Sequence, residues 1–288
     1  MAAAIKGRRF PSRIRCSQPS LDAVGRGLHG LGVFDRKGRA PMAAYLDTLA
    51  PWPEQDFAEF GPVEVRKLGR IQQLTASFLG RNWVAIPHVT HHDEVDVTAL
   101  ETARKAWNAA NPDVKATLLV PVVKAVAAAL RAYPVFNTSL MADGKSLVWK
   151  DYIHIGVAID TPNGLLVGVV RDCDTKTPAA ITEEIGGLSA RARAKGLSMA
   201  EMTGGSMTIS SLGHIGGTAF TPIVNAPEVA ILGMTRLQTR PMPGAGGAID
   251  WRQMLPLSLS YDHRVINGAD AARFVRRVGE ELANYRFE

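Results

Sequence analysis

The chain has 288 residues, of which 46% are hydrophobic, enough for one large domain or two small ones with a buried core. Its two cysteines, Cys16 and Cys173, lie far apart in sequence and indicate neither a disulfide framework nor a thiolate metal site. The net charge of +6 is concentrated in the head, because five lysines and arginines precede Asp22 and the remainder carries only +1. This distribution argues against a nucleic-acid surface on the body of the protein.

The most apolar segment, residues 116–130, is too short to span a bilayer and contains Lys124, so no membrane anchor is predicted. Residues 1–40 are rich in Gly, Arg and Ser without a sustained period, and we expect a poorly ordered basic head there. Its start is Arg-rich and lacks acids, as organelle transit peptides do, but a disordered basic tail has the same composition. The expected location is the cytoplasm, with the mitochondrial matrix as the alternative.

The first half of the compact region alternates between helix and strand signals. The periodicity predicts helices over residues 66–83, 98–110 and 117–133 and a strand over residues 86–97. The second of these helices is expected to begin at Thr98 as N-cap, with Glu101 completing a capping box. The third is apolar nearly all round, which predicts a buried helix with Pro121 in its first turn.

The second half is richer in strands. The expected strands cover residues 146–160, 164–172, 206–212, 228–237 and 254–262, and the expected helices cover 178–195 and 269–285. Thr-Pro-Asn-Gly at residues 161–164 predicts a hairpin turn. Gly196 is expected to cap the C-terminus of the helix over residues 178–195. Because helices and strands alternate irregularly, we predict an α/β fold in which helices back a mixed β-sheet.

His263 lies in Ser-Tyr-Asp-His-Arg-Val-Ile-Asn-Gly, residues 260–268, where an apolar strand ends before a helix. Such a position gives a side chain rigid support beside open backbone, as active sites require. A polar turn with Asn267 as a cap explains the same residues, so spacing alone leaves both interpretations open.

Ser210 lies in a second polar cluster, Thr-Ile-Ser-Ser-Leu-Gly-His-Ile-Gly-Gly at residues 208–217, where hydroxyls at a strand end precede three glycines. The cluster matches neither the G-x-S-x-G turn of hydrolases nor a phosphate-binding loop. His91 and His92 stand beside two acids, but neighbouring strand residues point to opposite faces, so no metal site is predicted.

Four long segments occur in the same order as in a known family: residues 81–101, 153–172, 208–233 and 260–274. From about Pro51 to the C-terminus, the chain resembles the catalytic domain of dihydrolipoamide acyltransferases of 2-oxo acid dehydrogenase complexes, and its segments look like the pyruvate (acetyl) branch. The resemblance implies a two-layer, chloramphenicol acetyltransferase-like fold assembled as homotrimers that form cages. It also implies a channel at a subunit interface, with coenzyme A or acetyl-CoA entering from one end and the dihydrolipoyl arm from the other.

The resemblance assigns catalytic roles to three residues. His263 matches the family's general base, and Ser210 matches the hydroxyl that donates a hydrogen bond to the oxyanion. An imidazole suits proton transfer between two thiols near neutral pH, and no acyl-serine is needed. Asn267 stands where many members carry Asp; an amide there can orient groups but cannot stabilise an imidazolium by charge.

Four further residues are weaker candidates for substrate or cofactor binding. Asp160 and Thr161 match positions that approach the channel, although a turn role explains them equally. Arg81 is a candidate for contact with coenzyme A, and Arg264 is expected in an ion pair near the site rather than in direct catalysis. No metal is expected.

The resemblance also leads us to expect a catalytic domain over residues 51–288 and no lipoyl domain, because the Asp-Lys-Ala turn of such domains is missing. The lipoyl group is then supplied by another domain or chain. Residues 35–46 resemble the end of a peripheral-subunit-binding domain, so a degenerate remnant is expected up to about residue 50, and docking of pyruvate dehydrogenase and dihydrolipoamide dehydrogenase stays open. Two alternatives to the acetyltransferase are a truncated scaffold protein and a free-standing acetyltransferase for a small hydroxyl substrate.

Overall fold

The computed structural model describes residues 53–287 and divides the chain into two compact units, Met1–Arg66 and Lys67–Glu288. The described part of the first unit contains one short 3-10 helix, η1 (Phe57–Phe60), whose N-terminus is capped by the Asp56 carboxylate. The predicted basic head and the binding-domain remnant lie outside the described residues, and so does the predicted start of the catalytic domain. These boundaries remain predictions.

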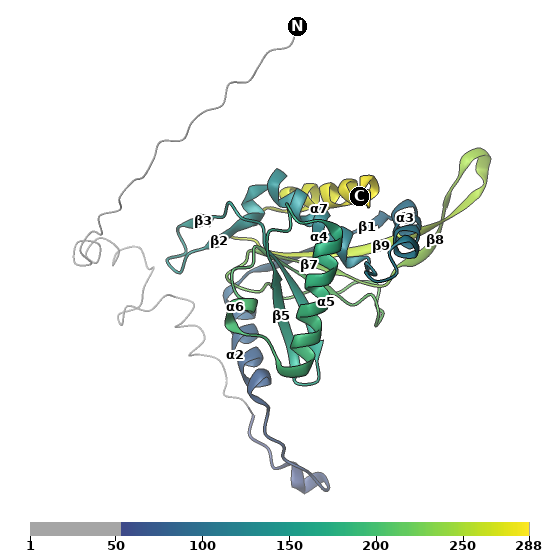
Figure 1. Ribbon diagram of the computed structural model, residues 1–288. Coiled ribbons are helices and arrows are strands. Elements are labelled where there is room, and N and C mark those ends of the chain that lie inside the picture. The colour runs from purple at the N-terminus through teal and green to yellow at the C-terminus, as the bar shows by residue number, and fades with distance from the viewer. Residues whose placement is uncertain (1–52, 288) are drawn as a thin grey trace, which may run out of the picture. The chain divides into compact units, whose positions relative to one another are not determined.

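The second unit is built on a mixed sheet with strand order β1-β9-β7-β6-β4-β5, and β8 pairs with the outer part of β9 (Figure 1). The parallel pairs are β4 with β6 and β6 with β7, and every other pair in this sheet is antiparallel. The strands are β1 (His88–Asp96), β4 (Ile155–Thr161), β5 (Gly164–Val170), β6 (Met207–Ser211), β7 (Ala230–Met234), β8 (Gln238–Pro243) and β9 (Ile249–Asp262). A separate small sheet pairs β2 (Thr138–Leu140) with β3 (Leu147–Trp149).

Helices pack against this sheet to form the second layer. The helices are α2 (Arg70–Ala85), α3 (Thr98–Ala110), α4 (Leu119–Ala132), α5 (Pro178–Lys195), α6 (Met199–Met202) and α7 (Gly268–Asn284), with 3-10 turns η2 (Pro134–Asn137) and η3 (Ala245–Gly247). Figure 1 shows α4, α5 and α7 together over the sheet, and α4 is the most buried of them. Its Val122, Val123 and Val126 are fully buried in the core, as expected for a helix that is apolar nearly all round. The predicted α/β fold, a mixed sheet backed by helices, is confirmed.

The hairpin of β4 and β5 and the helix α5 follow the sequence signals. Thr161 and Gly164 close the predicted turn, and Gly196 ends α5 with φ of +84°, a conformation that glycine adopts without strain. The predicted strand over 146–160, however, is two strands in different sheets. The Asn137 amide donates to the carbonyls of Lys150 and Tyr152 between them, which holds the chain away from ladder pairing there.

The capping box predicted at Thr98 is wrong. Val97 is the N-cap residue and Thr98 is already helical, because its hydroxyl donates to Asp96 (2.6 Å) and accepts from the Gln253 N–H (2.8 Å). The Glu101 carboxylate instead forms an ion pair with Arg104 (2.6 Å). Other partners, two of them local and one distant in sequence, therefore occupy the groups that the capping box would have used.

Sequence reasoning also missed β8, which contains two prolines. Pro241 and Pro243 cannot donate ladder hydrogen bonds, and prolines of this kind are confined to sheet edges. In the structure β8 is such an edge strand, paired only with β9 among the described strands, and the two form the projecting hairpin of Figure 1.

Candidate active site

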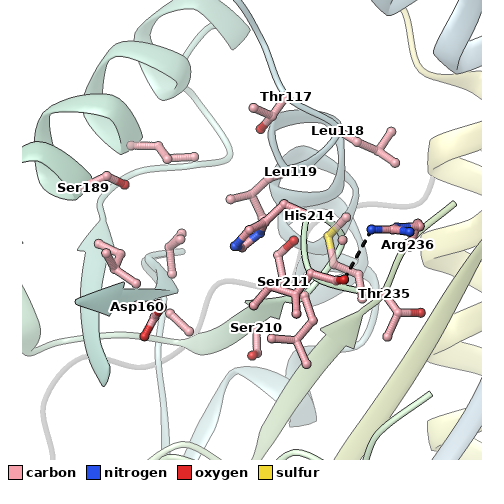
Figure 2. Close-up of a pocket in the computed structure, with 18 of the residues that line it drawn as sticks. Thr117, Leu118, Leu119, Asp160, Ser189, Ser210, Ser211, His214, Thr235 and Arg236 are labelled. Atoms are coloured by element: carbon pink, nitrogen blue, oxygen red, sulfur yellow. Dashed lines mark hydrogen bonds between the residues drawn. The ribbon is translucent and has the colours of Figure 1, made fainter. Parts of the chain in front are cut away.

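Ser210 lies at the end of β6 in a pocket of about 800 Å³. The pocket walls come from the ends of two strands and from three helices: Asp160 of β4, Ser210 and Ser211 of β6, Arg104 of α3, Leu119 of α4 and Ser189 of α5. Figure 2 shows the two serines at the strand end with their hydroxyls pointing in opposite directions, Ser211 toward Leu119 and His214 and Ser210 away from them. The Ser210 hydroxyl is partly buried and makes no hydrogen bond to a described residue, so it is available to a ligand.

Cationic side chains stand at the rim of the same pocket. Arg193 of α5 and Arg236 after β7 are exposed, and Arg236 donates to the Ile215 carbonyl (3.3 Å; dashed in Figure 2). Arg104 is different, because its guanidinium donates hydrogen bonds to the Glu101 carboxylate and the Ala116 carbonyl. The hydrogen bond from Arg104 holds the pKa of Glu101 below its usual value. Neither Arg193 nor Arg236 forms an ion pair with a described acidic residue, so both guanidinium groups offer positive charge at the rim.

His263 lies just beyond the end of β9 in an exposed turn. Its backbone N–H donates to the Pro87 carbonyl (3.1 Å), while its imidazole has no hydrogen-bond partner among the described residues. The neighbouring Asp262 carboxylate is buried and forms an ion pair with Arg264 (2.6 Å), which raises the pKa of that guanidinium. Arg264 is thus engaged in the turn itself, and the imidazole of His263 is free to meet a substrate.

Asn267 is the N-cap residue of α7, with an extended backbone (φ −91°, ψ 156°). Its side chain makes no capping hydrogen bond, although Asn is among the residues favoured at this position for that purpose. The amide is exposed four residues after His263. The Asn267 amide is therefore not used as a helix cap and can form hydrogen bonds with other groups.

One chain cannot bring His263 and Ser210 together. In the register, Ser210 pairs with Gly233 of β7, and Gly233 pairs with Ser258 of β9. His263 follows five residues later, and β9 runs antiparallel to β7, so it lies at the edge where β6 and β7 begin. With a rise of about 3.4 Å per residue and about 4.8 Å between strands, the two Cα atoms lie roughly 20 Å apart.

The other predicted residues divide between these places. Asp160 lines the Ser210 pocket, whereas the buried Thr161 hydroxyl donates to the Gly164 carbonyl (2.6 Å) and closes the hairpin turn. Arg81 donates to the Asn82 carboxamide oxygen (2.8 Å) and, with Arg264, lines a second cavity of about 210 Å³. The predicted set is therefore spread over a pocket, an exposed turn and a small cavity.

The second cavity contains a residue that no sequence signal indicated. Glu228 is 5% exposed, and its Oε2 has no hydrogen-bond partner among the described residues. Burial raises the pKa of this carboxyl to about 7, although hydrogen bonds from Thr208 and the positive charge of Lys150 act to lower it. Burial also lowers the pKa of Lys150. Within residues 53–287 we find no group of three or more His, Cys, Asp or Glu side chains that could hold a metal ion, and no helix there is long and apolar enough to cross a membrane.

Residues 61–287 match the family model of 2-oxoacid dehydrogenases acyltransferase (catalytic domain). The dihydrolipoyllysine-residue acetyltransferase component of the pyruvate dehydrogenase complex of Pseudomonas aeruginosa is 52% identical over 240 residues, covering 83% of this chain and 44% of that protein. The corresponding component of Cupriavidus necator is 50% identical over 264 residues, covering 88% and 47%. This chain thus spans less than half the length of these relatives.

Two solved structures have the same fold, each with a TM-score of 0.79. The cubic core of a pyruvate dehydrogenase multienzyme complex is 50% identical and covers 82% of this chain and 98% of its own. Dihydrolipoamide acetyltransferase of Azotobacter vinelandii is 49% identical with the same coverage, and its structure was studied for the role of a serine, a histidine and an asparagine four residues further on in its catalytic mechanism. The resemblance inferred from the sequence is confirmed: the chain belongs to the acyltransferase family of the 2-oxoacid dehydrogenases, matched over the catalytic domain.

Proposed function

We propose that this protein transfers an acetyl group between a dihydrolipoyl thiol and coenzyme A, because its relatives are named dihydrolipoyllysine-residue acetyltransferases. The observation that carries the proposal is the pair of unengaged side chains, the imidazole of His263 and the hydroxyl of Ser210, in a chain about half identical to acetyltransferase components. His263 and Asn267 also have the spacing of the histidine and asparagine studied in the Azotobacter enzyme.

The chemistry uses the two side chains in turn. His263 takes the proton of the attacking thiol, because a thiol of pKa about 8.5 is mostly protonated at neutral pH. The thiolate adds to the thioester carbonyl, and the Ser210 O–H donates to the oxyanion that forms. When the carbonyl re-forms, the C–S bond to the other thiol breaks and the imidazolium returns the proton to that sulfur. The acyl group changes sulfur atoms without an acyl-enzyme.

The site is completed by two copies of the chain. Because His263 and Ser210 lie at opposite edges of one sheet, the exposed turn of one copy must reach the Ser210 pocket of the next. A head-to-tail contact closes into a ring when its rotation brings the last copy back to the first, and we propose a ring of three copies, the homotrimer. Further assembly into a cage is proposed from the cubic core formed by the similar pyruvate dehydrogenase complex.

The pocket rim suggests how the substrates divide. Coenzyme A carries several phosphate charges, and Arg193 and Arg236 offer positive charge beside Ser210. We propose that coenzyme A or acetyl-CoA enters past these arginines, while the lipoyl group, supplied by another domain or chain, enters from the other end of the channel. Asp160 contacts substrate from the pocket wall, and no residue is assigned to a metal.

We further propose pyruvate dehydrogenase and dihydrolipoamide dehydrogenase as partner enzymes and the cytoplasm as the location, since the relatives are components of bacterial pyruvate dehydrogenase complexes. The catalytic domain is proposed to begin near residue 51. Thr161, Arg81 and Arg264 are proposed to shape the site through the turn and cavity contacts described above.

Co-expression of two inactive variants tests the site. His263→Ala and Ser210→Ala each remove one half, and random mixing in trimers forms an intact pair at about one interface in four, so roughly a quarter of wild-type activity should return. Acetyl transfer from acetyl-CoA to dihydrolipoamide is the assay. Mixed particles no more active than either variant would contradict a site shared between copies, and wild-type particles that transfer nothing would favour a scaffold.

A further inference from the structure

His88, the first residue of β1, has both ring nitrogens occupied by backbone groups. Its Nδ1 lies 2.8 Å from the Ile86 carbonyl oxygen, and its Nε2 lies 3.0 Å from the Val224 amide nitrogen. A carbonyl can only accept and an amide N–H can only donate, so Nδ1 carries the proton and Nε2 is the acceptor. The geometry therefore fixes His88 as a neutral imidazole in one tautomer.

The same loop residue is held a second time, from the end of α2. Val224 is fully buried, and its carbonyl accepts a hydrogen bond from the Asn82 side-chain amide (3.0 Å). Val224 also packs with Ile86 and Ile231 in a small apolar cluster. We call Asn82, His88 and Val224 the α2–β1 clamp, because together they fix the connection between α2 and β1 to the loop that precedes β7.

This connection supports the proposed catalytic turn. Pro87 lies between Ile86, whose carbonyl accepts from the His88 ring, and His88 itself, and the Pro87 carbonyl accepts the backbone N–H of His263 (3.1 Å). His88 is also the cross-strand partner of Asp262, the residue before His263. A displacement of residues 86–88 would therefore move the peptide that carries the catalytic imidazole.

We propose that His88 is a positioning residue for acyl transfer: as a neutral imidazole it holds Val224 and keeps the Pro87 carbonyl under the His263 peptide. The inference rests on the proposed role of His263 as base. It assigns His88 no contact with substrate, so its effect reaches the reaction only through the place of the His263 side chain.

Protonation of His88 would break the clamp, because Nε2 would then present a proton to the Val224 N–H, which is also a donor. The charged groups near this ring are Asp262, opposite it in β9 and already paired with Arg264, and Arg81 and Glu228 on the neighbouring cavity wall. None of them lies within ion-pair distance of His88 among the described contacts. The hydrogen bonds of this ring therefore require the neutral tautomer.

Two substitutions at His88 test the proposal in the whole protein. His88→Leu removes the acceptor, and we expect kcat for acetyl transfer to dihydrolipoamide to fall about 10- to 100-fold, as for a misplaced catalytic group, with the KM for acetyl-CoA changed less than about threefold. His88→Gln can place its carbonyl oxygen near the Nε2 position and accept the Val224 N–H in the same way. It is expected to restore kcat to within about threefold of wild type.

His154→Leu is the matched control. His154 also accepts a backbone N–H, from Asp172 (3.0 Å), but it precedes β4, three strands from β9 in the sheet. We expect the kcat and the KM for acetyl-CoA of this variant to match wild type, even if thermal unfolding occurs at a lower temperature.

The outcomes separate the clamp from the proposed function. Unchanged kcat in His88→Leu, no recovery of kcat in His88→Gln, or an equal loss of kcat in His154→Leu would each overturn the positioning role of His88. Full activity in His263→Ala would instead overturn the function on which the clamp rests.

Discussion

The two edges of the central sheet are built for different tasks. At the edge where β6 ends, Ser210 lies in a pocket enclosed by three helices, with cationic side chains at its rim. At the opposite edge, His263 lies on an exposed turn whose backbone is fixed by Pro87 and whose ring is free. The first edge is shaped to receive a ligand, and the second to present a side chain to another surface.

Strand direction explains this division. Residues that follow neighbouring parallel strands lie at the same end of the sheet, where their side chains can come together within one chain. Here β9 runs antiparallel to β7, which places the residue after β9 and the end of β6 at opposite edges. A mixed sheet can thus carry two complementary half-sites, and only association of copies makes them whole.

The largest effect is expected at the His263 edge. His263→Ala removes the proton acceptor, and kcat for acetyl transfer should fall by about 10²- to 10⁴-fold. Because the side chain is exposed and makes no hydrogen bond to a described residue, the thermal stability and the particle size should not change. A variant that keeps more than a tenth of the activity would place the base elsewhere.

At the pocket edge, two adjacent serines allow a matched comparison. Ser210→Ala should lower kcat by about 10²- to 10³-fold through loss of the oxyanion donor. Ser211 is partly buried as well, but its hydroxyl points to the opposite face of the sheet, toward Leu119 and His214 in Figure 2, so Ser211→Ala should change kcat by less than about threefold. A reversed order would move the donor by one residue, and equal effects would indicate a role of the hydroxyls in packing.

The sequence was informative where a local pattern has one physical solution. The Thr-Pro-Asn-Gly turn, the apolar helix α4 and the glycine that ends α5 were all predicted correctly. The Thr98 capping box failed because Asp96 and Gln253, one of them distant in sequence, occupy the threonine hydroxyl. The separation of His263 from Ser210 could not be predicted from either motif, since it depends on strand order and direction; only the family resemblance implied a site at a subunit interface.

Glu228, beside the His263 edge, should affect stability rather than catalysis. Its pKa is raised from 4.5 to about 7 in the folded protein, so between these values the folded state keeps a proton that the unfolded state has lost. This contribution to stability is complete below pH 4.5 and is lost as the pH rises through 7. Glu228→Gln should therefore raise the free energy of unfolding at pH 8 by about 1 to 3 kcal/mol and leave it nearly unchanged at pH 4.

Denaturant unfolding of both proteins across this pH range is the measurement. Glu201→Gln is a control of opposite sign, because hydrogen bonds from Ser198 and Arg191 lower the pKa of Glu201 to about 2. Its stabilising contribution is lost as the pH falls, so this variant should be less stable than wild type at pH 8. Parallel pH curves for wild type and Glu228→Gln would show that the carboxyl is solvated in solution.

The smallest effect is expected at Asn267, where the His263 edge lacks a carboxylate. Asp is as good an N-cap residue as Asn, and its negative charge is stabilised by the positive N-terminal end of the helix dipole. Asn267→Asp should therefore change the free energy of unfolding by less than about 0.5 kcal/mol. A negative charge near His263 favours the imidazolium, so the acid limb of kcat/KM should move to higher pH, while the plateau at alkaline pH changes less than about threefold. Asn267→Ala, which adds no charge, should leave the limb in place. If the limb also stays in place in Asn267→Asp, the side chain of residue 267 does not face the imidazole in the assembled site, and the orientation of His263 depends on its backbone and on the neighbouring copy.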